Sequence, residues 1–464
     1  MTPYAVLITI LAYFAAMALV SWLSGRKKEG QDVFYTGGRK THWTVVAIAM
    51  IGSCMSGVTY VSVPGMVGTS GFGYLQMCIG FFLGYLVIAF VLTPLYFRLD
   101  VVSIYQYLEK RFGMGAYKTG AWFFFLSKML GASVRLFLVC LTLQLLLFGP
   151  LGLPFWLNVV CNVVVCFAYT FRSGVKSVIW TDVLKTVCMV VAVTLCVILI
   201  GKDLGGIRIH EKVFFLDDVN HPQYFWKQLL GGLFTVVAMT GLDQDMMQRT
   251  LSCKDTRDSQ KNLIASSLLQ TVVIALFLCL GSLLYQFAAA HGIPQTGDRL
   301  FPAVATSDLL PGIVGVLFVL GLVSSAYGAG GSALTSLTTS FTVDILGKGA
   351  DVKVRKAVHV GMAVLMAVTV IVFNALNSTS AIDAVYKLAS YTYGPILGLF
   401  TFGILTRKAV KDRYVPVVAL VAPAVCLILQ LNSERWFGGY RFSYELLLVN
   451  AALTFLGLCL LRKK

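Results

Sequence analysis

Seven charged side chains interrupt stretches of sequence that are otherwise apolar, and they are the residues best suited to recognise an ion or a charged solute. The acidic ones are Asp182, Asp243 and Asp245, and the basic ones are Lys128, Arg135, Lys185 and Lys387. If these stretches cross a membrane, each charge costs about 2.5–3.5 kcal/mol on insertion scales and is kept when it is paired, hydrated or used. The sequence therefore predicts buried ion pairs, a binding site, or both.

Arg135 and Lys185 are each interpreted through the carboxylates they could meet. Arg135 lies deep in an apolar stretch, and its guanidinium fork fits a carboxylate. That carboxylate belongs either to a solute or to Asp243 or Asp182. Lys185 follows Asp182 by one helical turn, and this spacing favours an ion pair between the two side chains.

Lys128 and Lys387 lie closer to the ends of their apolar stretches. A lysine in such a position usually extends its amine to the membrane surface. Lys387 has a second interpretation, because together with Arg135 it favours a substrate that carries an anionic group. The sequence therefore predicts a small polar, carboxylate-bearing organic solute.

Three apolar stretches contain clusters of glycine, proline and hydroxyl residues. These segments are Gly52–Pro64, Ala238–Asp245 and Gly321–Ser332. Backbone polar groups in lipid must be paired, so an irregular backbone is tolerated only where it lines a cavity or is buried in protein. The first two segments lie five predicted spans apart, and such a pair is typical of inverted-repeat transporters. For the third, close helix packing through small residues is the alternative to an ion site.

A series of apolar runs positions these residues and covers the whole chain. The protein has 464 residues, of which 58% are hydrophobic and 12% are charged, whereas a soluble domain carries about 25% charged residues. Each run has about 20 residues or more, enough to cross a bilayer as a helix. The predicted spans are 4–24, 42–69, 72–97, 117–149, 153–171, 174–201, 225–250, 259–290, 310–346, 357–377, 380–406, 413–431 and 442–462. The expected fold class is therefore all-α, a polytopic membrane protein of about thirteen transmembrane helices in a single domain, 1–464.

Lysine and arginine residues are unevenly distributed over the loops between these spans. Most of them lie on the side reached after each odd-numbered span, and cytoplasmic loops carry such an excess of basic residues. We therefore expect the N-terminus outside and Arg462–Lys464 in the cytoplasm. This asymmetry accounts for the net charge of +16, so no nucleic-acid partner is expected. The first span begins almost at Met1 without a basic region, which argues against a cleaved signal peptide.

The chain lacks the sequence patterns that are typical of enzymes. There is no histidine-based metal motif, nucleophile elbow or phosphate-binding loop. The 11 cysteines lie almost entirely within the predicted spans and show neither a disulfide framework nor metal-ligand spacing. We therefore predict no catalytic residue and no cofactor.

Four motifs carry a resemblance to a known family. They are Gly37–Arg39 with Trp43, Ser53–Gly57 and Pro64-Gly65; Trp180–Val183; Gln248–Leu251; and Ser332–Asp344. Together they resemble the sodium:solute symporter family, which includes the sodium/glucose, sodium/proline and sialic acid transporters. The resemblance covers essentially the whole chain. Two further segments, Gly241–Arg249 and Ser390–Pro395, resemble a subgroup found in Bacteroides-like bacteria.

The resemblance implies the fold of the leucine transporter (LeuT-like), a 5+5 inverted repeat that works by alternating access around a site in the middle of the membrane. Residues 4–24 would form an extra N-terminal helix, 42–201 the first five-helix repeat, 225–406 the second, and 413–462 two closing C-terminal helices. It also implies a bacterial inner-membrane location and function as a monomer. The implied partners are a small-molecule solute, the sodium ion and the lipid bilayer.

The resemblance further implies a sodium ion bound between the broken second span and the ninth span. The second span would supply the main-chain oxygens of Gly52 and Met55, which are the hard ligands such a cation prefers. In an ungapped register, the ninth span would supply the carbonyl of Ser325 and the side chains of residues 328 and 329. Those residues are Gly328 and Ala329, and neither has the hydroxyl group that relatives use. The sodium site is then weak, rebuilt with water, or lost.

Two alternatives for the ion ligands remain open. A register displaced by one helical turn would use Gly321, Ser324 and Ser325 of the ninth span. A second ion site, used by some relatives, would involve Asp182, with Ser332 as the remaining hydroxyl on that face. If sodium binding is lost, the same fold would support a proton-coupled transporter or a uniporter.

The resemblance places the solute between the second, third, fourth, seventh and eleventh spans. The residues expected to contact it are Cys54, Thr59, Gln76, Arg135, Thr240, Asp243 and Lys387. Apolar side chains at Cys54 and Val58 stand where sugar transporters place hydrogen-bonding residues, which argues against a sugar substrate. The predicted function is secondary active transport, a cation-coupled symport in which sodium drives uptake of a small solute. Sodium-independent transport on the same fold, or less favourably sugar symport, is the alternative.

Overall fold

The computed structural model describes residues 3–24, 41–99, 103–170, 175–206, 217–219, 221, 223–347, 351–376 and 381–462. The predicted Gly37–Arg39 motif lies outside these ranges. Gly328 and Ala329 are placed only as part of a helix, and their surroundings lie outside the described part of the structure.

All regular secondary-structure elements in the described ranges are helices. The helices before the midpoint of the chain are α1 (Pro3–Ser24), α3 (Trp43–Cys54), α4 (Gly57–Ser70), α5 (Tyr74–Val87), α6 (Thr93–Leu99), α7 (Gln106–Arg111), α8 (Met114–Leu143), α9 (Phe155–Thr170) and α10 (Val175–Asp203). Those after it are α11 (Phe225–Val236), α12 (Gln244–Thr250), α13 (Thr256–His291), α14 (Leu300–Thr306), α15 (Gly312–Ser340), α16 (Val352–Leu376), α17 (Ala381–Leu405), α18 (Val415–Trp436) and α19 (Leu446–Leu460). Short π-helical segments continue several of them, and η4 (Val237–Gly241) extends α11.

The described helices account for most of the predicted membrane spans. Eight helices are long and apolar enough to cross a membrane, and ten spans result if each of two sharply bent helix pairs counts as one. Three shorter apolar helices, Tyr4–Met17, Phe155–Ala168 and Leu446–Leu460, fall within the first, fifth and thirteenth predicted spans. The all-helical membrane architecture therefore agrees with the sequence, while the total of thirteen spans stays a prediction.

Both predicted interruptions coincide with sharp bends. Helices α3 and α4 meet at 64° and the α11–η4 segment meets α12 at 76°. At the first bend Met55 and Ser56 are extended, with ψ of 117° and −179°, so the helical hydrogen-bond ladder stops there. Pro64 lies inside α4, so the break is confined to two residues and does not reach Pro64.

The expectation of a third irregular segment was wrong, because Gly321–Ser332 lies within the continuous helix α15. The small residues of this helix allow close packing instead. A β-carbon added at Gly321 would lie 2.2 Å from the hydroxyl of Tyr60 in α4. Such an approach is possible only for glycine, so this part of α15 follows the packing interpretation.

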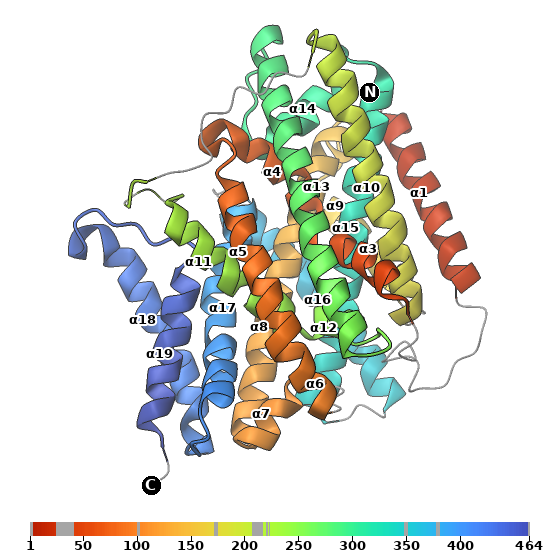
Figure 1. The fold of residues 1–464 in the computed structure, drawn as a ribbon. Helices are drawn as coiled ribbons and strands as arrows, with labels where there is room; N and C mark the ends of the chain where they lie inside the picture. Colours follow the sequence, from red (N-terminus) through yellow and green to blue (C-terminus); the bar gives the residue numbers. More distant parts are fainter. Residues whose placement is uncertain are drawn as a thin grey trace.

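Helices that are distant in the sequence lie side by side in the bundle. Helix α10 packs against both α3 and α15, α5 packs against α11, and α17 packs against α8 and α19. Helices α18 and α19 lie on one side of the molecule and α1 lies on the opposite side (Figure 1). Each of the two broken helices thus packs against continuous ones.

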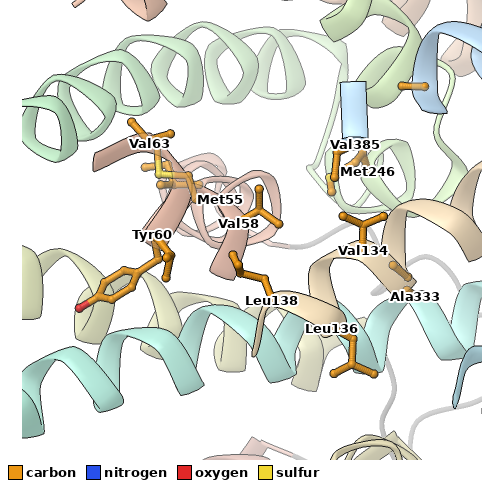
Figure 2. Packing of buried hydrophobic residues seen from close by; sticks show 14 of the residues in the cluster. Met55, Val58, Tyr60, Val63, Val134, Leu136, Leu138, Met246, Ala333 and Val385 are labelled. Atoms are coloured by element: carbon orange, nitrogen blue, oxygen red, sulfur yellow. The ribbon is translucent and has the colours of Figure 1, made fainter. Parts of the chain in front are cut away.

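Buried hydrophobic residues join the broken helices to their neighbours in one core. Met55 and Val58 come from the α3–α4 break, Val134 from α8, Met246 from α12 and Val385 from α17 (Figure 2). All five side chains are at most 7% exposed. This packing fixes the position of the breaks relative to α8 and α17.

The α4–α13 contact predicts a stability difference between two glycine substitutions. A β-carbon at Gly281 would lie 2.5 Å from the Pro64 carbonyl oxygen and 2.8 Å from its Cα, so Gly281→Ala is expected to lower stability by roughly 1–3 kcal/mol through overpacking. Gly361 in α16 has nothing within 4 Å, so Gly361→Ala is the matched control. Thermal unfolding of the two purified variants in detergent measures the difference, and equal midpoints would contradict this account of the contact.

Candidate functional site

A cavity lies between the two breaks and is bordered by six membrane helices. It is lined by residues of α3–α4, α5, α8, α11–η4, α13 and α17, together with Met246 of α12. Four residues predicted to contact the solute line it, namely Cys54, Thr59, Arg135 and Thr240. The sequence therefore identified side chains from three separate segments that the fold brings to one cavity.

Three other residues predicted to contact the solute do not line this cavity. Gln76 is fully buried, and its side-chain amide donates hydrogen bonds to the carbonyls of Gly73 and Gln223 at 3.1 and 3.3 Å. Asp243 is held in ion pairs, and Lys387 is exposed on α17. Their part in solute binding stays a prediction.

The cavity also contains polar residues that the sequence did not single out. The Cys54 Sγ lies 3.3 Å from the Tyr85 hydroxyl, and Tyr85 donates a hydrogen bond of 3.0 Å to Gln270 Oε1. These contacts connect α3, α5 and α13 across one wall. A tyrosine and a glutamine in apolar helices carry no spacing signal, and only the fold shows that they face a shared space.

Two tyrosines join neighbouring walls at the border of the cavity. The hydroxyl of Tyr74 at the start of α5 lies 2.6 Å from that of Tyr386 on α17, and Tyr386 lines the cavity. The Tyr386 ring packs against Tyr444, with 4.8 Å between ring centroids. The start of α5 and the start of α17 are therefore held together beside the cavity.

A buried network of five charged side chains lies around the second break. The Lys128 ammonium contacts Asp243 Oδ2 at 3.1 Å and Asp245 Oδ2 at 3.2 Å. The Arg249 guanidinium contacts Asp245 Oδ1 at 2.8 Å and Asp182 Oδ2 at 3.1 Å. None of the five side chains is more than 13% exposed. Each charge therefore has an oppositely charged neighbour in an interior where an unpaired one is costly.

Hydroxyl groups from three more helices complete the network. Ser53 of α3 donates to Asp182 at 2.9 Å, Ser332 of α15 to Asp245 at 3.2 Å, and Tyr393 of α17 to Asp243 at 2.9 Å. Asp243 also caps α12, because its side chain accepts hydrogen bonds from the first amides of that helix. The α12 bend is thus tied to α3, α8, α10, α15 and α17.

These contacts correct two expectations about buried charges. Lys128 does not extend to the membrane surface, because its side chain is 7% exposed and bound between two carboxylates. Lys185 does not pair with Asp182, whose carboxylate contacts Ser53 and Arg249 instead. Arg249, which is 2% exposed, is a member of the network that the sequence did not single out. It lies in the Gln248–Leu251 motif and the Gly241–Arg249 segment, but neither indicated a buried ion pair.

The structure excludes one of the two interpretations left open for Arg135, an ion pair with Asp182 or Asp243. The acids that could have paired with it, Asp182 and Asp243, are bound to Arg249 and Lys128. Among the described residues, no carboxylate lies within ion-pair distance of Arg135, and the residue lines the cavity. Its guanidinium therefore places a positive charge beside the space that a solute would fill.

Two of the residues predicted to bind sodium, Gly52 and Met55, lie at the end of α3, where the first break faces α15. A β-carbon added at Gly57, just after the break, would lie 3.7 Å from the Ser325 hydroxyl. Ser324 and Ser325 are fully buried and donate to the carbonyls of Gly321 and Leu322. Their oxygens keep lone pairs that a cation could use. This part of α15 thus offers hydroxyls in the region of the displaced register.

Comparisons with known proteins agree with the all-helical fold and identify its family. The model of the sodium:solute symporter family matches residues 34–412. The sodium/sialic acid symporter NanT of Aliivibrio fischeri is 27% identical over 93% of this chain and 89% of its own. The human sodium/iodide cotransporter is 24% identical over 84% of this chain, which spans 65% of that longer protein. A solved structure of a Na+-coupled sialic acid symporter in a substrate-bound outward-open state superposes with a TM-score of 0.80. It is 20% identical and covers 98% of this chain and 97% of its own, so it supports the fold.

The ion network predicts a strong effect of removing its only lysine. Lys128→Met would leave Asp243 and Asp245 without their ammonium partner, and breaking a buried ion pair in this way costs about 3–5 kcal/mol. We expect a large fall in the thermal midpoint of the purified protein. The double variant Lys128→Met with Asp243→Asn should recover part of that loss, since it also removes the one carboxylate left without a cation, while Asp245 keeps Arg249.

Lys261 supplies the matched control for that experiment. It forms an ion pair of 3.4 Å with Asp258, but its side chain is 58% exposed, and such pairs contribute about 0–1 kcal/mol. Lys261→Met should therefore leave the midpoint almost unchanged. A Lys128→Met variant as stable as Lys261→Met would show that the network does not stabilise the fold.

Proposed function

The chain belongs to the sodium:solute symporter family, and on that premise we propose that it couples sodium entry to the uptake of a small organic anion, with a carboxylate as the anionic group. The cavity between the two breaks is the proposed solute site. Arg135 is proposed to bind the carboxylate through its planar guanidinium fork, which presents two parallel donors to such a group.

The observation that carries this proposal is that Arg135 has no described carboxylate partner while the nearby acids are all paired. Asp182, Asp243 and Asp245 already contact Lys128 or Arg249. A guanidinium at membrane depth without a counter-ion is costly, and an anionic solute in the cavity would supply one. The solute would thus be selected by charge before any finer contact is made.

Neutral groups in the cavity suit the rest of a polar solute. Thr59, Tyr85, Thr240 and Gln270 offer hydroxyl and amide groups, while Phe81, Met239 and Val385 offer apolar surface. Such a mixture is typical of small-molecule sites. Two relatives are named for anions, sialic acid and iodide, and sialic acid carries a carboxylate. Both names support an anionic solute for this chain.

Sodium is proposed to bind between the first break and α15. The main-chain oxygens of Gly52 and Met55 would contribute from the break, and Ser324 and Ser325 would contribute hydroxyls from α15. The hydroxyls support the displaced register, since Gly328 and Ala329 have none. Asp182 and Ser332 would influence a second ion only through the charge network that they already join.

The two bent helices support alternating access by a LeuT-like 5+5 repeat. The bends at α3–α4 and α11–α12 lie in the second and seventh predicted spans, as two related five-helix units (42–201 and 225–406) would require. We propose a single domain with the N-terminus outside, the C-terminus in the cytoplasm, and a location in a bacterial inner membrane. A monomer contains the whole proposed site.

Coupling to sodium is tested by uptake into proteoliposomes. An inward sodium gradient is expected to drive accumulation of labelled sialic acid or pyruvate, because ion binding would favour the solute-binding state. Labelled glucose serves as the uncharged control solute. A choline gradient serves as the sodium-free control. Equal uptake of the anions under sodium and choline would contradict the coupling, and preferred uptake of glucose would contradict the anion site.

The role of Arg135 is tested by neutralising it. Arg135→Gln is expected to weaken binding of the transported anion by roughly 10-fold or more, since a hydrogen bond to a charged group contributes about 1.5–3 kcal/mol. Ligand-induced thermal stabilisation of the purified protein measures this affinity. Arg257 lies exposed at the start of α13, so Arg257→Gln is the matched control. Unchanged affinity in Arg135→Gln would overturn the proposed role.

A further inference from the structure

Lys185 of α10 is a fully buried cation that neither the ion network nor the lining of the cavity uses. Its side chain is 0% exposed, and among the described residues its Nζ has no hydrogen-bond partner. Asp182, one helical turn earlier, directs its carboxylate to Ser53 and Arg249. Buried polar groups are almost always hydrogen-bonded, so an exception at full burial indicates a partner that is not always present.

The α10 segment that carries Lys185 packs directly on the first break. A β-carbon added at Gly52 would lie 2.6 Å from the Asp182 carbonyl oxygen and 2.5 Å from Thr186 Oγ1. Thr186 also donates a hydrogen bond of 2.9 Å to the Ile48 carbonyl. Lys185 lies between these two contact residues, and its four-carbon stem is flexible. The ammonium is therefore tethered next to the end of α3.

The end of α3 is a group of unused backbone acceptors. The Met55 amide bonds to the Ile51 carbonyl, and the next carbonyl used by an α4 amide is that of Ser56. The carbonyls of residues 52–55 therefore fall between the two hydrogen-bond ladders, and no described donor contacts them. Helix C-termini leave such carbonyls for side chains, water or ligands. A buried donor without an acceptor thus lies beside buried acceptors without a donor.

The charged groups around Lys185 come from four helices. Its ammonium interacts electrostatically with Asp182 of its own helix, Arg249 of α12, Arg135 of α8 and the Cys54 thiol of α3. The two arginines repel it and the single carboxylate is already shared. The break, with its negative carbonyl ends, offers the ammonium acceptors that no described donor uses.

We propose that Lys185 is a tethered cation that competes with sodium for the carbonyl oxygens of the α3–α4 break and thereby sets the sodium requirement of transport. This inference rests on the proposed sodium site. Two positive charges at contact distance in a low-dielectric interior exclude one another, so sodium binds only when the ammonium is displaced from the carbonyls.

The test is a sodium titration of the purified protein. Thermal stabilisation measures sodium binding, and choline replaces sodium so that the ionic strength stays constant. Lys185→Met removes the competing charge, and the half-saturating sodium concentration is expected to fall by at least 10-fold. Lys185→Gln keeps hydrogen-bond donors but carries no charge, so it should also lower the half-saturating sodium concentration. It replaces the methionine variant if that variant does not fold. Lys185→Arg keeps the charge and should stay within about threefold of the wild-type protein.

Lys227 provides the matched control. It is also a buried membrane lysine, at 5% exposure, but its Nζ donates to the Arg441 carbonyl and lies over the Tyr440 ring. Lys227→Met should leave the sodium titration unchanged. An equal fall in both methionine variants would overturn the proposal, since it would reflect a general effect of removing positive charge.

The remaining outcomes separate this inference from the proposed function. If Lys185→Met binds sodium within twofold of the wild-type concentration, the competition is overturned, and weaker binding of the anionic solute alone would identify Lys185 as a solute ligand. If sodium stabilises Lys185→Met but not the wild-type protein, the competition stands while sodium coupling of the wild-type protein fails. If sodium stabilises neither, both are overturned.

Discussion

The structure depends on the cost of leaving a charge or a backbone dipole unpaired inside a membrane. Asp245 lies at the point where this constraint is met most fully, because its two oxygens bind Lys128 and Arg249 at the same time. Through these partners, a bend of 76° in the seventh predicted span is held against α8 and α10. Without compensated charges, a break at this depth would expose both carboxylates and helix ends to hydrocarbon.

The first break meets the same constraint in a different way. It contains no charged residue, and its carbonyls are enclosed by α8, α10 and α15 rather than neutralised. Gly52 and Gly57 allow this enclosure, because each approaches a neighbouring helix too closely for a larger residue to be accommodated without displacement. One break is therefore held by ion pairs and the other by close packing, and the cavity lies between them.

The sequence was sufficient to locate the apolar spans, the two interrupted helices and the Cys54, Thr59, Arg135 and Thr240 side chains of the cavity. Hydropathy and glycine or proline content are local properties, so they can be evaluated without knowledge of the fold. Ion pairing is not local, and Lys128 and Lys185 were misassigned because Lys128 meets acids more than 110 residues away, while the Asp182 carboxylate expected to pair with Lys185 is taken by Arg249, 67 residues away. Gly321–Ser332 was expected to be irregular for a related reason, since small residues serve helix packing and helix breaking equally well.

The five-residue charge network also limits how this sequence can diverge. Neutralising Lys128 leaves Asp243 without a cationic partner, and neutralising Arg249 leaves Asp182 without one, whereas neutralising any one of the three acids leaves both cations paired. Homologues in which residue 128 is neutral are therefore expected to lack the carboxylate at 243. In an alignment, the network would then appear as positions on three helices that vary together because each change in charge is compensated by another.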